Sequence, residues 1–338
     1  MNTSILRKIR RAYELGPRWA GTMLSLRARR ALRLLPHIPP TLYVELTNAC
    51  NLNCAMCDRK SMTREESMMD MDLFTRIIDN AAEIRVPVVK LNRFGESLLH
   101  PRLTDMIRYS KERGIPWVYF TSNATLLNEQ KATDILTSGL DSITFSVDGA
   151  TAGTYEGIRK GAAYNKTVQN IRRFCELRET LRAGKPRTVV NTLLMRETWN
   201  EMADFFRTWT PIVDRINVMP VGRYGNVEDF SPIDRTRLKH EKRACHHPFD
   251  RLMIFWNGDV TICCGDINGE LKIGNVLDDR IEKLWKNETI RKYRRMHVAK
   301  QFDEIPICDQ CDGTNLTLFN EMAKARQNIY RRARASVQ

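Results

Sequence analysis

The chain has 338 residues, of which 42% are hydrophobic, enough to bury one large domain, alone or with a small second one. Its net charge of +14 lies mostly at the ends: residues 1–40 carry nine Lys and Arg against one acidic residue, and residues 321–338 carry five against one, which leaves +2 for the 280 residues between. An enzyme that binds nucleic acid at its catalytic centre needs basic residues in the central part of the chain. Because the central 280 residues carry only +2, we expect no nucleic-acid partner.

The ends of the chain carry the basic character. The start has no stretch of signal-peptide type and no window reaches the apolar length of a membrane span, so we expect a cytoplasmic protein. The N-terminal extension, residues 1–40, mixes apolar residues with arginines, as an amphipathic helix on an anionic membrane does, but we favour a pair of basic helices packed outside the body. With the basic tail, residues 319–338, it suggests an acidic surface or partner.

Short apolar runs in the body predict buried strands. Each is rich in β-branched or aromatic residues and apolar on both faces, as buried parallel strands are. Helix-like stretches separate the runs, and three of these end at Gly114, Gly139 and Gly184, where a helix stop is expected. The predicted strands are 41–47, 87–92, 117–122, 142–148, 188–194 and 215–221.

Strands and helices that alternate in this way predict an α/β fold. Six βα units in succession indicate parallel strands with right-handed crossovers, and they are too few for an eight-unit barrel. We therefore predict a partial (β/α)6 TIM-like barrel over 41–235, with ligands at the carboxyl ends of its strands. From about residue 240, short strands, turns and cysteines predict a small cysteine-rich domain over 240–318, with a hairpin at Asn257-Gly258.

The first cysteine group, Cys50, Cys54 and Cys57, directly follows the first predicted strand in "CNLNCAMC". Three thiolates can hold a [4Fe–4S] cluster by three of its irons and leave the fourth iron open, and an open metal position is typical of a catalytic site. Zinc completed by a distant ligand is the alternative that we weigh against it. A third of all the thiols in the chain lie within these eight residues, which argues against incidental cysteines.

This C-x3-C-x2-C spacing after the first strand of a partial barrel resembles the radical S-adenosylmethionine (SAM) superfamily. "FGESLLHP" resembles the family's motif after the second strand, which implies that Gly95 and Glu96 meet the methionine amino group of SAM. "TSNATLL" resembles the segment after the third strand, which implies that Ser122 and Asn123 lie near the ribose and carboxylate. The resemblance covers roughly residues 41–221.

A fourth motif extends the same resemblance. "SITFSVDGATAGTYEGIRKG" is similar to the family's fourth-strand motif, and this implies that Ser146, Asp148 and Arg159 face the cofactor carboxylate. Met56 departs from the family, in which the residue before the third cysteine is often aromatic. A thioether can still pack on the edge of an adenine ring, so we keep Met56 as a cofactor contact.

The second cysteine group comprises Cys245, Cys263, Cys264, Cys308 and Cys311, whereas Cys175 fits a buried apolar position in a helix. The run around the group resembles the SPASM or shorter twitch extension of the superfamily. This implies one auxiliary [4Fe–4S] cluster, held by four of these cysteines, with Cys264 spare or exchanged with Cys263. A structural zinc site is the alternative that spacing alone suits equally well.

The resemblance also implies the reaction. Reductive cleavage of SAM, with an electron donor such as flavodoxin or ferredoxin, gives a 5′-deoxyadenosyl radical that abstracts hydrogen from a C–H bond. The single-cluster extension resembles enzymes that oxidise or epimerise sugars and aminocyclitols, so we expect a small-molecule substrate. An epimerase needs a thiol that donates hydrogen, and the spare Cys264 is our catalytic candidate for that role.

Two other functions compete with this one. A peptide-modifying SPASM maturase is less favoured, because residues 1–40 are too short and too basic for the peptide-recognition domain that such enzymes often carry. A zinc-stabilised binding protein without catalysis is the third hypothesis. Four residues in loops that could contact a substrate are candidates for a general acid or base, each with little support from its residue type alone: Arg223, Tyr224, His246 and His247.

Overall fold

The structure is a computed structural model that describes residues 36–221, 242, 244–309, 311, 321, 324 and 327–328. The basic extension up to residue 35, most of the basic tail, and the candidates Arg223 and Tyr224 lie outside the described residues. Within the described part of the chain, no helix is both long and apolar enough to cross a membrane.

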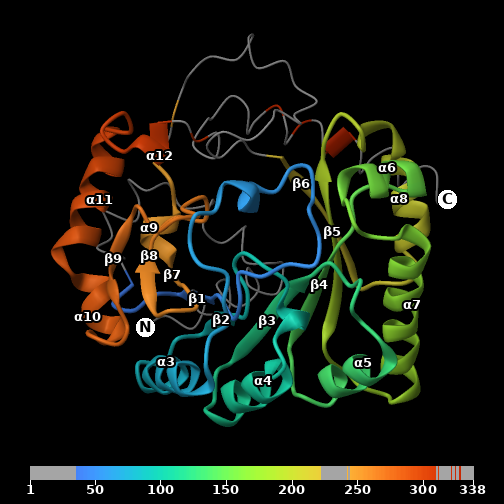
Figure 1. Cartoon of the computed structure of the whole chain (residues 1–338), viewed down its shortest axis with the longest axis horizontal. Helices are drawn as coiled ribbons and strands as arrows, with labels where there is room; N and C mark the ends of the chain where they lie inside the picture. Colours follow the sequence, from blue (N-terminus) through green and yellow to red (C-terminus); the bar gives the residue numbers. More distant parts are fainter. Residues whose placement is uncertain are drawn as a thin grey trace, which may run out of the picture.

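The six predicted strands form one parallel array in chain order, from β1 to β6. Each pairs in parallel with the next, so that Thr41 lies opposite Val88 and Val89 lies opposite Val118. All their carboxyl ends therefore meet at one edge, and the prediction of a partial (β/α)6 barrel is confirmed (Figure 1). The strands are β1 (Thr41–Val44), β2 (Val88–Lys90), β3 (Trp117–Ser122), β4 (Ser142–Ser146), β5 (Arg187–Leu194) and β6 (Arg215–Pro220).

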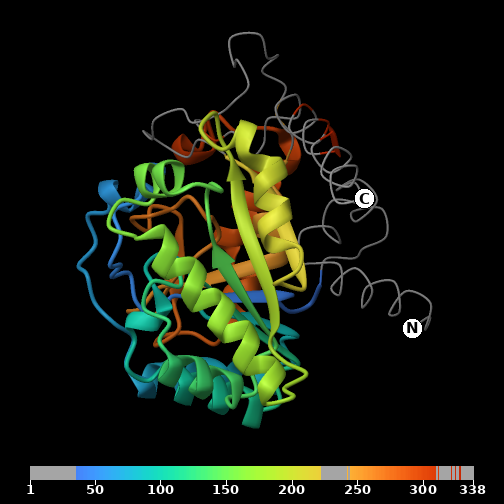
Figure 2. The ribbon, with the colours of Figure 1, turned by 90° about the vertical axis from the view of Figure 1, so that its right-hand side faces the viewer.

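Amphipathic helices lie along the outside of this array, as Figures 1 and 2 show. In the first of them, Leu73, Phe74, Ile77 and Ile78 repeat at helical spacing and are all buried, and Asp70 caps the N-terminus by accepting from the backbone N of Leu73 at 2.7 Å. The helices of this part are α3 (Met71–Glu83), α4 (Leu103–Glu112), α5 (Glu129–Leu136), α6 (Ala152–Ile158), α7 (Tyr164–Thr180) and α8 (Met202–Trp209), with the short 3-10 turns η1 (Asp58–Ser61), η2 (Ser97–Leu99) and η3 (Trp199–Glu201).

Two of the three predicted glycine stops are confirmed and one is wrong. Gly114 and Gly139 have φ of +80° and +84° just beyond their helices. After α7, however, the left-handed residue is Arg182, with φ +49°, and the backbone N of Ala183 donates to the carbonyl of Arg178 at 2.9 Å. The helix ends at Thr180 and this bond closes it before Gly184 is reached, so the glycine is not needed for the stop.

The cysteine-rich region adds β7 (Arg251–Ile254), β8 (Asp259–Thr261) and β9 (Lys272–Asn275) to the same sheet. β7 pairs in parallel with β1, and β8 and β9 follow antiparallel, giving the order β6-β5-β4-β3-β2-β1-β7-β8-β9. The predicted hairpin joins β7 and β8, with Gly258 at φ +86° after the turn. Its helices are α9 (His247–Asp250), α10 (Ile281–Lys286), α11 (Glu288–Ala299) and α12 (Pro306–Asp309).

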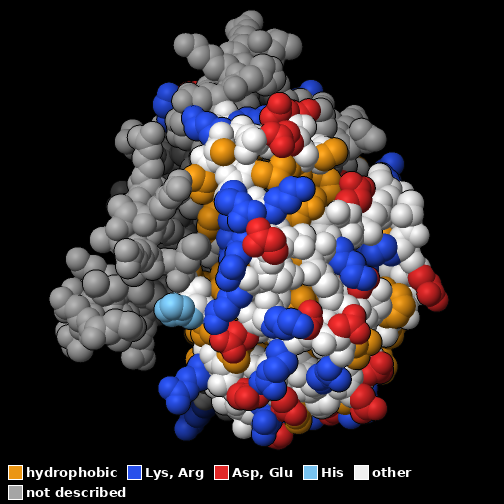
Figure 3. Space-filling view, turned by 90° about the vertical axis from the view of Figure 1, so that its left-hand side faces the viewer, with side chains coloured by type: hydrophobic (Ala, Val, Ile, Leu, Met, Phe, Trp, Pro, Cys, Tyr) orange, Lys and Arg blue, Asp and Glu red, His pale blue; other side chains and the backbone are white. Residues whose placement is uncertain are grey.

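One core runs through both parts of the fold. Leu42 and Val44 of β1 are fully buried, and they belong to the same apolar cluster as Leu252 and Ile254 of β7. On the outside, the face toward α10 and α11 carries Lys and Arg interspersed with Asp and Glu (Figure 3). The sheet is therefore continuous from the barrel into the cysteine-rich region, and the two cysteine groups follow strands of this one sheet.

Candidate functional site

The first cysteine group lies on the loop between β1 and η1. The loop is held against the segment after α6, because the backbone N of Asn53 donates to Lys160 O at 3.0 Å and that of Ala55 donates to Ile158 O at 2.8 Å. The three thiols are partly buried and not in disulfides. Burial raises the pKa of Cys54 to about 11, although nearby Arg159 opposes this. A metal or cluster has to displace that proton when the thiol binds it.

Gly95 packs against the backbone of residues 47–49, the segment that leads from β1 to the first cysteine. Its φ is +76°, and a Cβ there would lie 2.4 Å from the carbonyl oxygen of Thr47 and 2.7 Å from that of Ala49. The next residue, Glu96, donates its backbone N–H to the same Ala49 oxygen at 2.8 Å. The motif after β2 therefore supports the cysteine loop, and only glycine fits this contact.

The Glu96 carboxylate joins the second motif to the third. It is 2% exposed and accepts from Ser122 Oγ at 2.9 Å, from the backbone N of Asn123 at 2.7 Å and from the backbone N of Leu98 at 3.0 Å. Burial raises its pKa, and these hydrogen bonds act in the opposite direction. A carboxylate has about four acceptor positions, so one remains for a ligand's donor group.

Asn123 connects the third motif to the cysteine loop. Its Nδ2 donates to Asn51 Oδ1 at 3.0 Å, and Asn51 Nδ2 donates in turn to Thr125 Oγ1 at 2.8 Å. Sequence reasoning missed Asn51, although its place between Cys50 and Cys54 was a signal. The loops after β1, β2 and β3 thus share one hydrogen-bond network.

Arg159 links the fourth motif to the cysteines. Its Nη2 lies 2.6 Å from Asp148 Oδ2 and its Nη1 lies 3.9 Å from Cys54 Sγ. Asp148 is fully buried and also accepts from the backbone N of Leu193 at 2.6 Å. Burial acts to lower the pKa of Arg159, but Asp148 and Cys54 outweigh it, so the pKa is raised. The guanidinium is therefore a fixed positive charge beside the first thiol group.

An apolar patch completes this edge of the barrel. Met56 packs with Ile158, Met195 and Val221. Ser146, at the end of β4, is partly buried and pairs in register with Asn191 of β5.

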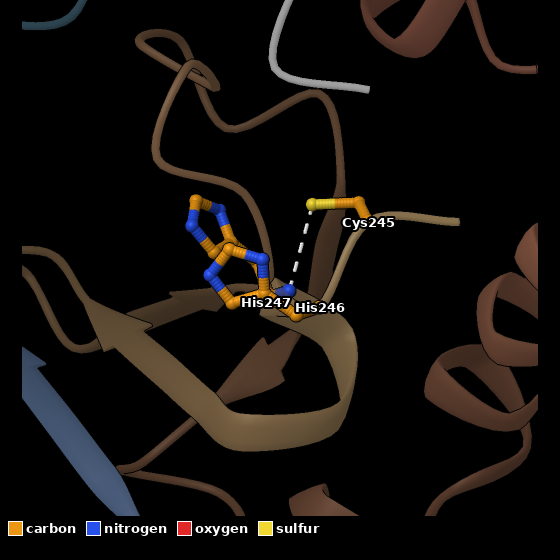
Figure 4. A group of neighbouring side chains, drawn as sticks. All are labelled: Cys245, His246 and His247. Atoms are coloured by element: carbon orange, nitrogen blue, oxygen red, sulfur yellow. Dashed lines mark hydrogen bonds between the residues drawn. The ribbon is translucent and has the colours of Figure 1, made fainter. Parts of the chain in front are cut away.

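The second cysteine group gathers at the other side of the mouth. The backbone N of His247 donates to Cys245 Sγ at 3.5 Å (Figure 4), and that of Gly265 donates to Cys263 Sγ at 3.3 Å. Electrostatic effects on the pKa of Cys263 come from Cys264, Cys245 and Cys311, which places these thiols near one another. The ligand atoms of Cys245, His246 and His247 all lie within 4.8 Å of one another.

The two adjacent histidines have opposite electrostatic behaviour. Burial lowers the pKa of His246 well below its usual value. Burial acts the same way on His247, but the thiols of Cys264 and Cys245 outweigh it and raise its pKa. In return, a hydrogen bond from Cys263 and the charge of His247 lower the pKa of Cys264. Cys264 and His247 therefore interact electrostatically, and each favours the charged form of the other.

His297 on α11 lies between two of these cysteines, Cys245 and Cys308. The backbone N of Cys245 donates to His297 Nδ1 at 3.3 Å, and Nε2 lies 3.6 Å from Cys308 Sγ. Burial lowers the pKa of His297 to about 4, so the ring is neutral. Because Nδ1 accepts, Nε2 carries the proton and donates toward the Cys308 sulfur. Nothing in the sequence marked this histidine.

Asp58 belongs to the first cysteine loop and is within electrostatic range of the second cysteine group. It directly follows Cys57, and its Oδ1 is buried without a hydrogen-bond partner among the described residues. Burial raises its pKa to about 6, with a further contribution from Cys264 of the second group. The two groups therefore lie close enough to affect each other electrostatically.

The chemistry of both groups fits metal clusters. Thiolates are the ligands of iron–sulfur clusters, and the nitrogen and sulfur donors of the second group also suit zinc. Around the first group, Arg159 Nε and Asn191 Oδ1 are buried without partners in the described part of the chain. Unsatisfied buried polar atoms of this kind indicate that a polar ligand belongs at the site.

Comparisons with known proteins agree with this geometry. Residues 44–208 match the radical SAM superfamily, and residues 245–312 match the SPASM family, an iron–sulfur cluster-binding domain. The tungsten-containing aldehyde ferredoxin oxidoreductase cofactor-modifying protein of Pyrococcus furiosus is 24% identical over 320 residues, which cover 82% of this chain and 90% of that protein.

Solved structures share the fold. BtrN in complex with AdoMet and 2-DOIA has a TM-score of 0.55 at 15% identity, covering 81% of this chain and 93% of that one. Streptococcus suis SuiB bound to its precursor peptide SuiA has a TM-score of 0.65 at 15% identity, covering 80% and 70%.

A partial parallel barrel with an open three-thiol site at its mouth and a second thiol group beside it defines an iron–sulfur enzyme of the barrel type. This chain belongs to the radical SAM superfamily and carries a C-terminal SPASM domain. It accordingly uses SAM, a [4Fe–4S] cluster at the SAM site and auxiliary iron–sulfur binding.

Proposed function

We propose that this enzyme oxidises an alcohol group of a small polar substrate, of sugar or aminocyclitol type, to a carbonyl. The barrel, 41–235, would bind SAM and substrate, and the domain at 240–318 would hold one auxiliary cluster. A flavodoxin or ferredoxin would supply electrons, and a reducing cytoplasm suits nine cysteines that form no disulfide.

Cys50, Cys54 and Cys57 would hold the SAM-site cluster through three irons. Cys245, Cys263, Cys308 and Cys311 would close the auxiliary site, since these thiols and the neutral His297 lie together. When bound, the first cluster with SAM supplies the radical that removes a hydrogen atom, and the auxiliary cluster supplies an acceptor for one electron.

The side chains of the barrel edge would orient the cofactor. Glu96 keeps one acceptor position for the amino group, and the network through Ser122 and Asn123 fixes its carboxylate. Arg159, held by Asp148, would offset negative charge beside Cys54. Met56 and its apolar neighbours would pack on the adenine.

The state of Cys264 favours oxidation over epimerisation. A thiol that quenches a carbon radical has to carry its hydrogen. A hydrogen bond from Cys263 and then the charge of His247 lower the pKa of Cys264, and the charge of His247 still acts in this direction when Cys263 is a cluster ligand. An oxidation needs no such donor: after hydrogen removal, the carbinol carbon loses one more proton and one electron and becomes a carbonyl. This pair of residues is the observation that supports our choice.

Epimerisation is the second candidate. Cys264 is the one cysteine of the second group that is left when four are assigned to the cluster. It affects the pKa of Asp58, which indicates that it lies near the first cysteine group. A hydrogen donor at this place would return a hydrogen to the substrate carbon. The similarity to SuiB concerns the fold, and a peptide substrate is the outcome that our assay has to exclude.

The test is turnover by the anaerobically reconstituted enzyme with SAM and dithionite in deuterium oxide. Hexoses, aminosugars, aminocyclitols and, for comparison, peptides are the substrate panel. Oxidation predicts 5′-deoxyadenosine together with a product two mass units lighter that keeps no deuterium on carbon after the positions next to the new carbonyl are exchanged back in ordinary water. A product of unchanged formula with one deuterium on carbon would establish epimerisation, and turnover of peptides alone would overturn both proposals.

A cysteine pair sharpens the same test. Cys264→Ala should leave the oxidised product and its labelling unchanged if Cys264 is not a hydrogen donor, whereas an epimerase would lose deuterium incorporation. Cys175→Ala is the matched control, because Cys175 is buried in α7 and belongs to neither cysteine group.

A further inference from the structure

A buried charged group connects the barrel mouth to the loop that carries Cys263. It consists of Glu45, which follows β1 and is fully buried, Arg64, and Arg93, whose side chain is 3% exposed. Arg93 lies after β2, two residues before Gly95. None of the family motifs described above includes Arg93 or Arg64 as a cofactor contact.

The two arginines bind the glutamate unequally. Arg64 makes a two-pronged contact, with Nη1 2.8 Å from Glu45 Oε1 and Nη2 3.0 Å from Oε2. Arg93 Nη1 lies 3.9 Å from Glu45 Oε2, which is too long for a hydrogen bond. Both guanidinium groups lie over the ring of Phe255, at 3.9 Å for Arg64 and 4.5 Å for Arg93.

Arg93 instead directs its donors toward the second cysteine group. Its Nη2 donates to the carbonyl oxygen of Cys263 at 2.8 Å and to that of Asp266. Its Nε and Nη1 are buried and have no hydrogen-bond partner among the described residues. An arginine buried with unused donors indicates an acceptor or negative charge that the protein alone does not supply.

The neighbouring carboxylates are already engaged elsewhere. Glu45 is held by Arg64, and the Asp266 carboxylate accepts from the backbone N atoms of Gly269, Glu270 and Leu271 and from a threonine hydroxyl. Burial lowers the pKa of Arg93, and Glu45, Asp266 and Cys263 oppose that effect. The guanidinium is thus within electrostatic reach of Cys263, and the Glu45 carboxylate, 3.9 Å away and held by Arg64, makes no hydrogen bond with it.

We propose that Arg93 is a positioning residue of the auxiliary cluster, which fixes the Cys263 loop on the barrel and offsets the negative charge of the cluster. A [4Fe–4S] cluster with four thiolates is anionic, and nearby positive charge makes its reduction easier. Arg93 therefore holds the auxiliary cluster at a higher reduction potential than its cysteines alone would give. The proposal rests on the auxiliary cluster and not on the substrate proposed above.

The test is a redox titration of the auxiliary cluster, followed by electron paramagnetic resonance. The full chain would carry Cys50, Cys54 and Cys57 changed to Ala, so that only the auxiliary cluster contributes a signal, and no substrate is needed. Arg93→Gln should shift the potential to more negative values, with about a tenfold lower reduced-to-oxidised ratio at a fixed potential, or about 59 mV for one electron. Arg93→Lys keeps the charge, so its potential should stay close to that of the protein with Arg93.

Arg76→Gln is the matched control. Arg76 also ties the barrel to the C-terminal region, donating to the carbonyls of Val276 at 3.1 Å and Leu277 at 2.7 Å, but neither residue neighbours a cysteine of the second group. It should leave the potential unchanged. An unshifted potential in Arg93→Gln, or equal shifts in the Gln and Lys variants, would overturn the proposal.

If Arg93→Gln loses the auxiliary cluster, its potential cannot be measured, and Arg64→Gln is then the variant to titrate. Arg64→Gln removes one positive charge from the same group without touching Cys263, and a smaller negative shift is expected there. If Arg64→Gln keeps its iron and shows no shift, the electrostatic role of the group is wrong. Because no turnover is measured, these outcomes do not depend on whether the enzyme oxidises an alcohol.

Discussion

Arg159 Nη1 lies 3.9 Å from the sulfur of Cys54, while its Nη2 lies 2.6 Å from the Asp148 carboxylate. The fourth-strand motif thus reaches the second cysteine of "CNLNCAMC" through one guanidinium. The family resemblance assigns Arg159 to the carboxylate of SAM and Cys54 to the iron of the cluster, and this contact places the two side by side. Whichever ligand is bound, its negative charge meets a fixed positive charge there.

Arg159→Gln should destabilise the protein. Removing one partner of a buried ion pair leaves Asp148 charged and uncompensated, at a cost of about 3–5 kcal/mol. Urea denaturation under anaerobic conditions would measure it. Arg207→Gln removes an exposed i,i+3 pair with Asp204 and should change stability by no more than about 0.5 kcal/mol. Equal effects of the two variants would contradict the structural role of Arg159.

Gly95→Ala should disrupt the first cysteine group. The new Cβ would lie 2.4 Å from Thr47 O, and the left-handed φ adds about 1–2 kcal/mol of strain. We expect loss of about four irons per chain, with the auxiliary iron retained. Gly153→Ala in α6 is the control, since its Cβ meets nothing within 4 Å. Full iron content in Gly95→Ala would show that the loop tolerates the shift.

Replacing Cys50, Cys54 and Cys57 together by Ala should lower the iron content from about eight to about four per chain. Each cysteine group then binds one cluster independently. Iron, sulfide and zinc analysis after anaerobic reconstitution would measure this. A fall from about four irons to none, with one zinc retained, would make the second group a zinc site and exclude its redox role.

Glu96→Gln should weaken SAM binding by at least about tenfold, or about 1.4 kcal/mol. The amide loses the negative charge, and its NH2 replaces one of two oxygens that accept from different donors, Ser122 Oγ on one and the backbone N of Asn123 on the other. Equilibrium dialysis of SAM on the reconstituted enzyme is the measurement. Glu129→Gln, at an exposed pair with Arg173, should bind SAM as the wild type does. Unchanged affinity in Glu96→Gln would remove Glu96 from the cofactor site.

Most of the barrel could be predicted from sequence because its strands are short apolar runs between amphipathic helices. The run 117–122 coincides with β3, and the other five runs differ from the observed strands only by a few residues at their ends. Hydrophobic periodicity reports burial, which both faces of a parallel sheet share. Hydrophobic periodicity does not report at which residue a helix ends. The prediction that α7 stops at Gly184 was wrong for this reason.

The residues between the motifs were harder to predict. Asn51, Arg93 and His297 act through partners distant in sequence, such as Thr125, 74 positions away, or Cys263, 170 positions away. A single Asn, Arg or His has many ordinary structural uses, so its type alone carries little information. Only the packing of one segment on another makes these residues part of the site.

The sequence by itself predicted the partial barrel and the three-thiol site after its first strand, because strand periodicity and cysteine spacing are local properties of the chain. The SAM-using chemistry followed from the resemblance of its motifs to the radical SAM superfamily. The tertiary structure decided how the two cysteine groups relate. Parallel pairing of β1 with β7 continues one sheet from the barrel into the SPASM domain and brings Asp58 near Cys264 and Arg93 against Cys263. Such contacts depend on which strand edge the last domain joins, and no local pattern encodes that choice.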